Sequence, residues 1–153
     1  MDRVEVDIKA RETIKPSSPT PHNPKIFNLS LLDQIAPPIY VPKIFYYENN
    51  GTKANLKPHE QIKLLKESLS QALTRIYPLA GRVKDNLFIE NNDEGAGFLE
   101  AQVNFPLHEI LRQPEVYVLD QLLPQDYHSN NLEAQLAVQV NFFSYEGMAI
   151  GML

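Results

Sequence analysis

Residues 77–82 read Tyr-Pro-Leu-Ala-Gly-Arg and directly follow an amphipathic segment at residues 58–76. Apolar side chains recur in that segment at helical spacing, which places them on one stripe facing a core: Ile62, Leu65, Leu69, Ala72 or Leu73, and Ile76. Pro58 suits the first turn of a helix. Pro78 has no backbone N–H to donate and therefore closes the helix. The sequence predicts a helix over residues 58–76 that stops abruptly before a turn at Gly81.

Composition narrows the class of protein. The length of 153 residues fits one domain that can bury a core. The net charge of −5 is spread along the chain without a basic block, which argues against a nucleic-acid partner. The sequence has no cysteine, so disulfides are excluded and a reducing compartment fits. No stretch has the character of a signal peptide or a membrane span, and we expect a cytoplasmic protein without a membrane partner.

The rest of the chain predicts short strands and helices. Four segments have the apolar alternation or β-branched composition of strands: residues 4–8, 39–47, 136–142 and 148–153. Pro42 implies an edge position or a bulge in its strand. Residues 85–90 and 98–103 predict a hairpin, because residues 91–97 between them tolerate left-handed backbone. Short helices or apolar turns are expected at residues 29–34, with a cap from Ser30 or Asn28, and at residues 106–113 and 118–123. The pattern is that of an α/β domain.

Two segments leave alternatives open. Residues 148–153 are apolar up to the last residue, and a carboxylate inside an apolar core is costly. Either they lie at a sheet edge, or residues 1–153 are the amino-terminal part of a larger domain, which we expect. Residues 15–24 carry closely spaced prolines that forbid a helix. They form either a loop packed on the same domain, which we favour, or a polyproline ligand for a signalling module.

Residue types that carry chemistry are sparse. His59 and His108 each precede a glutamate but lack the second histidine that a zinc-binding helix needs, so no metal site is predicted. Asp126 and His128 could form a base with an orienting group, yet no nucleophile lies nearby in the sequence. A cluster of aromatic residues is either the lining of a small-molecule pocket or ordinary sheet packing: Tyr40, Phe45, Tyr46 and Tyr47.

Four segments, in order along the chain, resemble the amino-terminal half of the BAHD acyl-CoA-dependent acyltransferases of plants. They are Ile14-Lys15-Pro16-Ser17-Ser18-Pro19-Thr20-Pro21, Leu29-Ser30-Leu31-Leu32-Asp33-Gln34, the segment from Leu65 through Arg82, and Phe142-Phe143 through Gly151. The sequence looks most similar to the alkaloid-acetylating branch, to which residues 112–124 add. The resemblance implies a mixed β-sheet flanked by helices in a chloramphenicol acetyltransferase-like fold, with residues 1–153 as its amino-terminal fragment.

The same resemblance implies a reaction. In this family a His-x-x-x-Asp histidine takes a proton from an acceptor hydroxyl or amine, which then attacks the thioester of acyl-CoA; an imidazole suits this role because its pKa lies near neutrality. The implied partners are acyl-CoA as co-substrate, most simply as an acetyl donor, and a small plant metabolite as acceptor. Complete family members are expected to be monomeric.

Residues 1–153 depart from the family pattern at the catalytic motifs. They contain neither His-x-x-x-Asp nor tryptophan, so the downstream Asp-Phe-Gly-Trp-Gly motif is also missing. No catalytic residue is therefore assigned, and we expect this chain alone to be inactive. The alternative is a non-catalytic binding or interaction half-domain, in which the apolar final strand adds to a partner's sheet.

One pocket wall can still be carried over from the family. The family strand that matches residues 40–47 borders the acceptor pocket. By alternation this nominates Val41, Lys43 and Phe45, or else the opposite face with Tyr40, Ile44 and Tyr46. Asp33 and Arg82 are expected to have structural roles, through hydrogen bonds to nearby loops.

Overall fold

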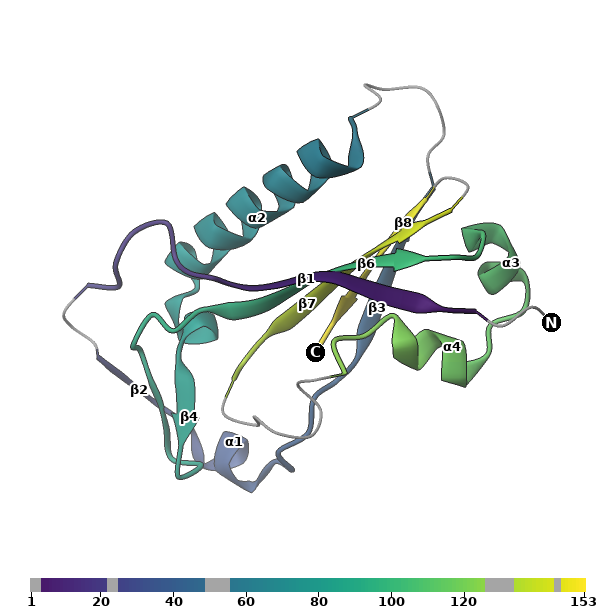
Figure 1. Ribbon diagram of the computed structural model, residues 1–153. Coiled ribbons are helices and arrows are strands. Elements are labelled where there is room, and N and C mark those ends of the chain that lie inside the picture. The colour runs from purple at the N-terminus through teal and green to yellow at the C-terminus, as the bar shows by residue number, and fades with distance from the viewer. Residues whose placement is uncertain (1–3, 22–24, 49–55, 126–133, 145–146) are drawn as a thin grey trace.

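The computed structural model describes residues 4–21, 25–48, 56–125, 134–144 and 147–153. A five-stranded sheet lies at its centre, in the order β1-β6-β7-β8-β3. The strands are β1 (Val6–Ile14), β3 (Lys43–Tyr47), β6 (Ala96–Val103), β7 (Ala137–Phe143) and β8 (Met148–Met152). The β6–β7 pair is parallel and the other neighbours are antiparallel (Figure 1). The predicted mixed sheet with flanking helices is confirmed.

Helices cover the two faces of this sheet. The long helix α2 (Pro58–Arg75) lies across one face, while the short helices α3 (Leu107–Arg112) and α4 (Val116–Gln121) lie on the other (Figure 1). Each helix layer closes a separate apolar core. The α2 core holds Leu73, Phe98 and Val140, and the α3–α4 core holds Val103, Leu107 and Leu122. The central strands are therefore buried on both faces.

The helix predicted at residues 58–76 is confirmed, with one correction at its end. Leu73 is fully buried, whereas Ile76 is 54% exposed and does not belong to the apolar stripe. The reason is that α2 ends at Arg75, and the chain then passes into the 3-10 turn η1 (Tyr77–Ala80). Gly81 itself is extended and does not turn the chain. It is glycine because a Cβ there would lie 2.4 Å from the carbonyl oxygen of Glu90.

An ion-pair cluster ties α2 to the outer strands. The Lys66 ammonium contacts the carboxylate of Glu12 in β1 and lies 2.6 Å from a carboxylate oxygen of Glu100 in β6. It also lies 5.4 Å from the centre of the Phe98 ring, within range of a cation–π contact. Burial lowers the pKa of Lys66, but the hydrogen bonds and charges of the two glutamates outweigh it, so the pKa is raised overall. The cluster fixes the side of α2 that faces β1 and β6.

A second, smaller sheet extends from one end of the molecule. It contains β2 (Ile26–Asn28), β5 (Phe88–Glu90) and β4 (Arg82–Lys84) in that order. The predicted hairpin between residues 85–90 and 98–103 is wrong, because β5 folds back on β4 and not on β6. Asp85 and Asn86 adopt positive φ values of 52° and 56°, and the Leu87 N–H donates to the Lys84 carbonyl at 2.9 Å. This tight turn leaves β6 to pair with β1 and β7.

The outer segments of the large sheet also differ in detail from the predictions. The strand predicted at residues 39–47 begins only at Lys43, after Pro42, whose nitrogen cannot donate to a ladder. It is an edge strand, as Pro42 implied. The final strand β8 lies between β7 and β3. The alternative that residues 148–153 form an edge strand is therefore wrong.

The proline segment packs on its own domain over residues 15–20. The Ser17 N–H donates to the hydroxyl of Thr74 at 2.8 Å, and the hydroxyl of Ser70 donates to the Lys15 carbonyl at 2.7 Å. The Thr20 N–H donates to the carboxylate of Asp93 at 2.9 Å. Because α2 and the 91–95 loop bind this segment, the packed-loop interpretation is confirmed there and the signalling-ligand alternative is withdrawn. Residues 22–24 lie outside the described part of the chain.

Polar side chains bind α4 to the middle of the sheet. Gln139 and Asn141 of β7 are fully buried on the α3–α4 face. The Gln139 amide donates to the Gln121 carbonyl and the Asn141 amide to the Leu122 carbonyl, each at 2.9 Å. Gly151 of β8 allows the same backbone to approach, since a Cβ there would lie 2.1 Å from the Leu122 oxygen. The end of α4 is thus held on β7 and β8 by hydrogen bonds and close backbone packing.

Candidate functional site

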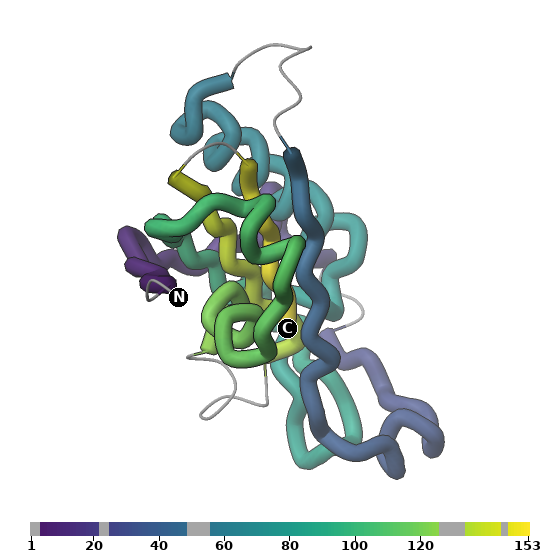
Figure 2. Tube along the Cα trace, turned by 90° about the vertical axis from the view of Figure 1, so that its right-hand side faces the viewer, coloured from purple at the N-terminus to yellow at the C-terminus, as the bar shows by residue number. Residues whose placement is uncertain are grey.

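A cavity of about 380 Å³ opens where the small sheet meets the end of β8. Figure 2 shows the small sheet and the helix α1 (Leu31–Ile35) projecting from one end of the molecule. We call this space the Val41 cavity. Its lining comes from four separate stretches of the chain, between residues 29 and 41, between 83 and 86, at 134–135 and at 153: Leu29, Asp33, Ala36 to Val41, Val83, Asn86, Ala134, Gln135 and Leu153. The cavity is of the size that small organic ligands occupy.

The wall formed by α1 is held by its own capping residues. The Asp33 N–H donates to the Ser30 hydroxyl at 3.2 Å, and the Ser30 N–H donates to the Asp33 carboxylate at 3.0 Å. This reciprocal pair is a capping box, which satisfies backbone donors that a short helix otherwise leaves free. The predicted cap at Ser30 and the structural role of Asp33 are confirmed. The first wall of the cavity thus has a defined shape without a core of its own.

Hydrogen bonds join this wall to the rest of the molecule. The Leu29 N–H donates to the Leu87 carbonyl at 3.0 Å, and the side-chain amide of Asn86 donates to the Gln34 carbonyl at 2.5 Å. On the other side, the hydroxyl of Tyr40 donates to the Ala134 carbonyl at 2.7 Å. The cavity walls are therefore fixed to one another mainly by polar contacts to backbone.

Arg82 stabilises the base of the small sheet. Its guanidinium is buried, donates to the carbonyls of Gly81 and Gly95 at 2.8 and 2.9 Å, and lies 3.0 Å from a carboxylate oxygen of Glu94. These bonds hold the start of β4 against the loop that leads to β6. The predicted structural role of Arg82 is confirmed.

The chemistry of the lining is that of a binding surface. Hydrogen bonds from the Ser30 hydroxyl and then from the Ser30 N–H lower the pKa of Asp33, so its carboxylate is charged at neutral pH and occupied by the cap. The other polar groups are those of Tyr40, Asn86 and Gln135. No histidine is among the described residues that line the cavity. This lining can select a ligand by shape and by a few hydrogen bonds, but it offers no evident base.

The structure separates the pocket residues predicted from the sequence. Val41 and Tyr40 line the cavity. Lys43 and Phe45 lie on the α2 side of β3, because they pair with Met152 and Ile150 of β8. Ile44 and Tyr46 face the opposite side and pack against the α3–α4 core, where burial raises the pKa of Tyr46. The residues of each face proposed from alternation therefore do not line one common pocket, because β3 begins only after Val41.

Sequence reasoning missed most of the lining. The turn residue Asn86, the loop from Ala36 to Pro38 and Gln135 were not nominated. A signal was present in the proline pair Pro37-Pro38, which keeps apolar residues such as Ile39 outside any helix or strand. Two of the segments that resemble the family adjoin this cavity. Residues 29–34 lie beside it, and residues 77–82 lead into β4, which forms another wall.

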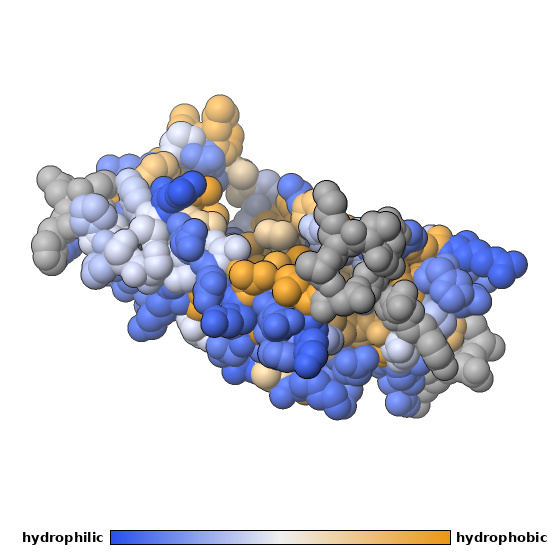
Figure 3. Space-filling view, turned by 90° about the horizontal axis from the view of Figure 1, so that it is seen from above, coloured by the Kyte–Doolittle hydropathy of each residue, from blue (hydrophilic) through white to orange (hydrophobic). Residues whose placement is uncertain are grey.

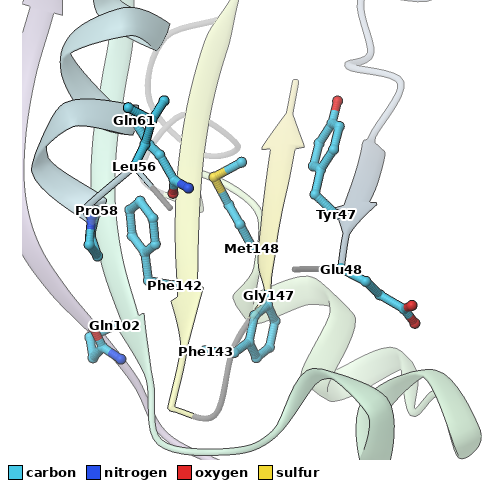
Figure 4. Close-up of a pocket in the computed structure, with 10 residues that line it drawn as sticks. All are labelled: Tyr47, Glu48, Leu56, Pro58, Gln61, Gln102, Phe142, Phe143, Gly147 and Met148. Atoms are coloured by element: carbon cyan, nitrogen blue, oxygen red, sulfur yellow. The ribbon is translucent and has the colours of Figure 1, made fainter. Parts of the chain in front are cut away.

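A second hollow of about 360 Å³ lies between the start of α2 and the strands β7, β8 and β3. Its lining includes Phe142, Met148 and Tyr47 from the sheet and Gln61 from the helix (Figure 4). Its exposed lining is mixed, with glutamine and glutamate beside apolar side chains.

The remaining candidates that lie in the described parts of the chain do not come together in a site. His59 and His108 are exposed on the surface, as predicted. In the described parts of the chain, no group of three or more histidine, aspartate or glutamate residues could hold a metal ion. Asp126 and His128 lie outside the described residues. None of the helices that the structure describes is long and apolar enough to cross a membrane.

Comparison with known proteins places these observations in a family. The sequence model of the family described as the Transferase family matches residues 4–153 of this chain. The chain belongs to the Transferase family. Its members include the BAHD acyltransferases that the four sequence segments resemble, and relatives in the same family carry the fold described above.

Individual relatives support the assignment to the Transferase family. The crystal structure of vinorine synthase superimposes on 97% of this chain with a TM-score of 0.87 at 37% identity, and the match covers 37% of that protein. Limonoid 21-O-acetyltransferase of Melia azedarach is 45% identical over 148 residues, covering 95% of this chain and 34% of the relative. Salutaridinol 7-O-acetyltransferase of Papaver somniferum is 41% identical over 150 residues, covering 95% and 31%. The chain spans about a third of the length of the curated relatives it matches.

Proposed function

We propose that residues 1–153 supply one wall of the acceptor pocket in an acyl-CoA-dependent acyltransferase. The complete enzyme transfers an acyl group, most simply acetyl, from acyl-CoA to a hydroxyl or amine of a plant specialised metabolite of alkaloid type. The observation that carries this proposal is the Val41 cavity, which lies between α1, the small sheet and the end of β8 in a chain of the Transferase family. The named relatives act as O-acetyltransferases on a limonoid and on salutaridinol.

The lining of the cavity supports binding of a rigid, largely apolar acceptor. Pro37, Pro38, Ile39, Val41 and Val83 contribute apolar surface, and such surface gains free energy when a ligand covers it. Tyr40 and Asn86 fix the walls through bonds to backbone, so the pocket is largely formed before a ligand binds. The acceptor's shape is therefore recognised by aliphatic walls and its orientation by a few polar groups.

The chemical step needs a base that residues 1–153 do not contain. The family's histidine belongs to a His-x-x-x-Asp motif, and this motif does not occur in the sequence. We assign no catalytic residue and expect no acyl transfer by this chain alone. Acyl-CoA enters as co-substrate and no further cofactor is required. The complete enzyme is proposed to be a cytoplasmic monomer without nucleic-acid or membrane partners.

A chimeric enzyme tests the proposal. Residues 1–153 are joined to the part of vinorine synthase that lies beyond the matched region, and acetyl transfer from acetyl-CoA is measured with a panel of alkaloid and limonoid alcohols. The chimera should be active, while residues 1–153 alone should not. Turnover by residues 1–153 alone would overturn the assignment of no catalytic residue.

Val41 provides the specific test of the cavity. A Val41→Trp variant of the chimera fills the cavity and should raise KM for the acceptor about tenfold or more, since removing apolar contacts and adding a clash costs about 1–3 kcal/mol. KM for acetyl-CoA should stay unchanged. Leu31→Ala on the exposed side of α1 is the matched control, because Leu31 does not line the cavity. An unchanged acceptor KM in an active, folded Val41→Trp chimera would contradict an acceptor site here.

A further inference from the structure

The large sheet has one half-face that helices cover only in part, although Met148, Ile150 and Met152 on it pack against the α2 core. On the α2 side, apolar side chains of β8 and β3 point away from the α3–α4 core, and Lys43 lies on the same face at the start of β3; the apolar residues are Phe45, Tyr47, Met148, Ile150 and Met152. Phe45 and Tyr47 are 45% and 48% exposed, and the other three are partly exposed. Viewed from the α2 side, apolar side chains form the floor of a recess beside a polar ridge (Figure 3). We call this surface the α2 trough.

The helix α2 covers only the other half of that face. Lys66 binds Glu12 of β1 and Glu100 of β6, which fixes α2 over these strands. Gln61 lies on the opposite flank, because it lines the hollow that Phe142 and Met148 also line (Figure 4). Leu64 and Ser68 follow Gln61 at helical spacings of three and seven residues, so they belong to the same flank. Leu64 is 50% exposed there, an apolar side chain at the rim of the trough.

The dimensions of the trough suit one helix. Neighbouring strands lie about 4.8 Å apart, so the two strands β8 and β3 present a surface about 10 Å wide. A helix with its side chains is about 10 Å across. The five residues of β8 span about 17 Å, which a helix of about 11 residues would cover. A face of five strands thus has room for α2 and for one further helix beside it.

The relatives contain additional chain that could supply such a helix. The vinorine synthase structure matches 97% of this chain, and therefore this sheet, but only 37% of vinorine synthase is accounted for by the match. A trough left open to solvent is disfavoured, because contiguous exposed apolar surface of this kind is rare on proteins that act alone. The trough is also flanked by the small Ser68 and Ala72, which allow a neighbouring helix to approach α2 closely.

We propose that the α2 trough is the docking site for an amphipathic helix from the remaining two-thirds of the transferase. The helix lies beside α2 and places apolar residues at spacings of three, four and seven positions on Phe45, Ile150 and Leu64. Its opposite face is polar. This contact joins the sheet of residues 1–153 to the rest of the enzyme, at a place separate from the Val41 cavity. The inference rests on family membership and is independent of which acceptor the cavity binds.

The absence of cysteine from the sequence makes a direct test possible. Phe45→Cys places one thiol on the trough floor, and Lys63→Cys places one on the outer surface of α2, where the native side chain is 77% exposed. Each variant is made in residues 1–153 and in the chimera with vinorine synthase. Labelling of the introduced cysteine by a small maleimide is followed by mass spectrometry of its peptide, so that cysteines in the other part do not interfere.

The expected result is protection of one thiol only. Phe45→Cys should react about tenfold or more slowly in the chimera than in residues 1–153, because reaction then requires local opening of the docked helix. Lys63→Cys should react at the same rate in both. Equal labelling of Phe45→Cys in a folded chimera would overturn the proposal. Slow labelling in residues 1–153 alone, with a dimer by light scattering, would also overturn it and assign the trough to a second copy.

A second variant covers the possibility that the cysteine alters packing. Ile150→Glu introduces a charge on a face that is open in residues 1–153 and closed in the chimera. Its melting temperature should fall by several degrees more in the chimera than in residues 1–153, and an equal fall would contradict docking. Acetyl transfer is measured separately. A chimera with a protected thiol but no acetyl transfer would support the docking and contradict the proposed function. A chimera with acetyl transfer but an unprotected thiol would contradict the docking and support the proposed function.

Discussion

The large and small sheets of this molecule are stabilised in different ways. The five-stranded sheet carries two apolar cores, with Leu73, Phe98 and Val140 among its fully buried residues. The small sheet and α1 bury very little: every residue of β2 is exposed, and α1 has no buried residue. The small sheet and α1 are held by capping and turn hydrogen bonds around Ser30 and Asn86, and by the buried Arg82 and Ile89 at the base of the sheet.

This difference separates stability from binding. Apart from the buried Ile89 of β5, much of the apolar surface of the small sheet and α1 is exposed, and part of it lines the Val41 cavity. The exposed side chains of a region of this kind can change at little expense to the fold. The relatives fit this view, since enzymes named for limonoid and salutaridinol acetylation are 45% and 41% identical to this chain over 148 and 150 residues. The predictions below test the division, from the largest effect to the smallest.

The largest effect is expected in the α2 core. Leu73→Ala should lower the free energy of unfolding by about 2–5 kcal/mol, because it removes apolar contacts and leaves a cavity. Leu87→Ala in the turn between β4 and β5 of the small sheet, where the side chain is half exposed, should lower it by less than about 1 kcal/mol. Urea denaturation followed by circular dichroism measures both. Similar losses for the two variants would mean that the small sheet shares the core's stability.

The next effect concerns the buried amides between β7 and α4. Asn141→Leu keeps the branched shape of the side chain but removes the donor to the Leu122 carbonyl, and a buried acceptor left without a partner costs about 1–3 kcal/mol. The matched control is Asn92→Leu on the exposed loop after β5, which should change the unfolding free energy by less than about 0.5 kcal/mol. A neutral Asn141→Leu variant would show that α4 is held by apolar packing alone.

A smaller effect is expected from the ion-pair cluster. Lys66→Met should cost up to about 1 kcal/mol at low salt, and less at high salt, because the pairs are partly exposed. The pKa of Lys66 is raised above its ordinary value of 10.5, so its contribution is complete below pH 10.5 and is lost as the pH rises through the folded-state value. Unfolding free energy measured between pH 9 and about 11.5 should fall less steeply for the Met variant than for the parent chain. Identical slopes of unfolding free energy against pH for the two chains would contradict a stabilising role for the ion-pair cluster.

The smallest global effect is expected at the α1 cap. Ser30→Ala removes a capping bond worth about 1 kcal/mol to that helix, yet global unfolding should be unchanged because α1 buries nothing. Amide exchange at Gln34 and Ala36, whose N–H groups bond to Ser30 and Leu32, should be faster. Hydrogen bonds from Ser30 lower the pKa of Asp33, so protection of these amides should decline as the pH falls below its ordinary value of 3.8. A loss of global stability would refute the independence of the small sheet.

Much of the fold was predictable because its signals are local. The stripe from Ile62 to Leu73 and the stop at Pro78 identify α2, and the spacing of Ser30 and Asp33 identifies a capped turn. The misplaced hairpin shows the limit of such signals. Strand pairing is decided by residues far apart in sequence, and the short turn at Asp85-Asn86 was hidden beside the longer polar segment at 91–97.

The site was harder to predict than the fold. Gln139 and Asn141 alternate with apolar residues in β7, yet they are buried, because the backbone at the end of α4 covers them. The Val41 cavity combines residues between Leu29 and Leu153, a juxtaposition that spacing in sequence does not reveal. Alternation placed Val41 with Lys43 and Phe45, although Pro42 marks the point where alternation begins. The position of these candidate residues follows from where the sheet starts, which only the tertiary structure shows.

The strand order has a consequence for how the chain is made. The outer strands β1 and β3 pair with β6 and β8, which leave the ribosome after about 100 further residues, so folding depends on distant partners. At ordinary rates of translation, the partner of each outer strand is synthesised about 5–20 s after the strand itself. Lys9 lies in β1, and Pro42 lies just before β3. Lysine and proline at such positions discourage premature pairing with other nascent chains. Slowing synthesis between codons 48 and 96 should therefore increase the demand for chaperones during expression.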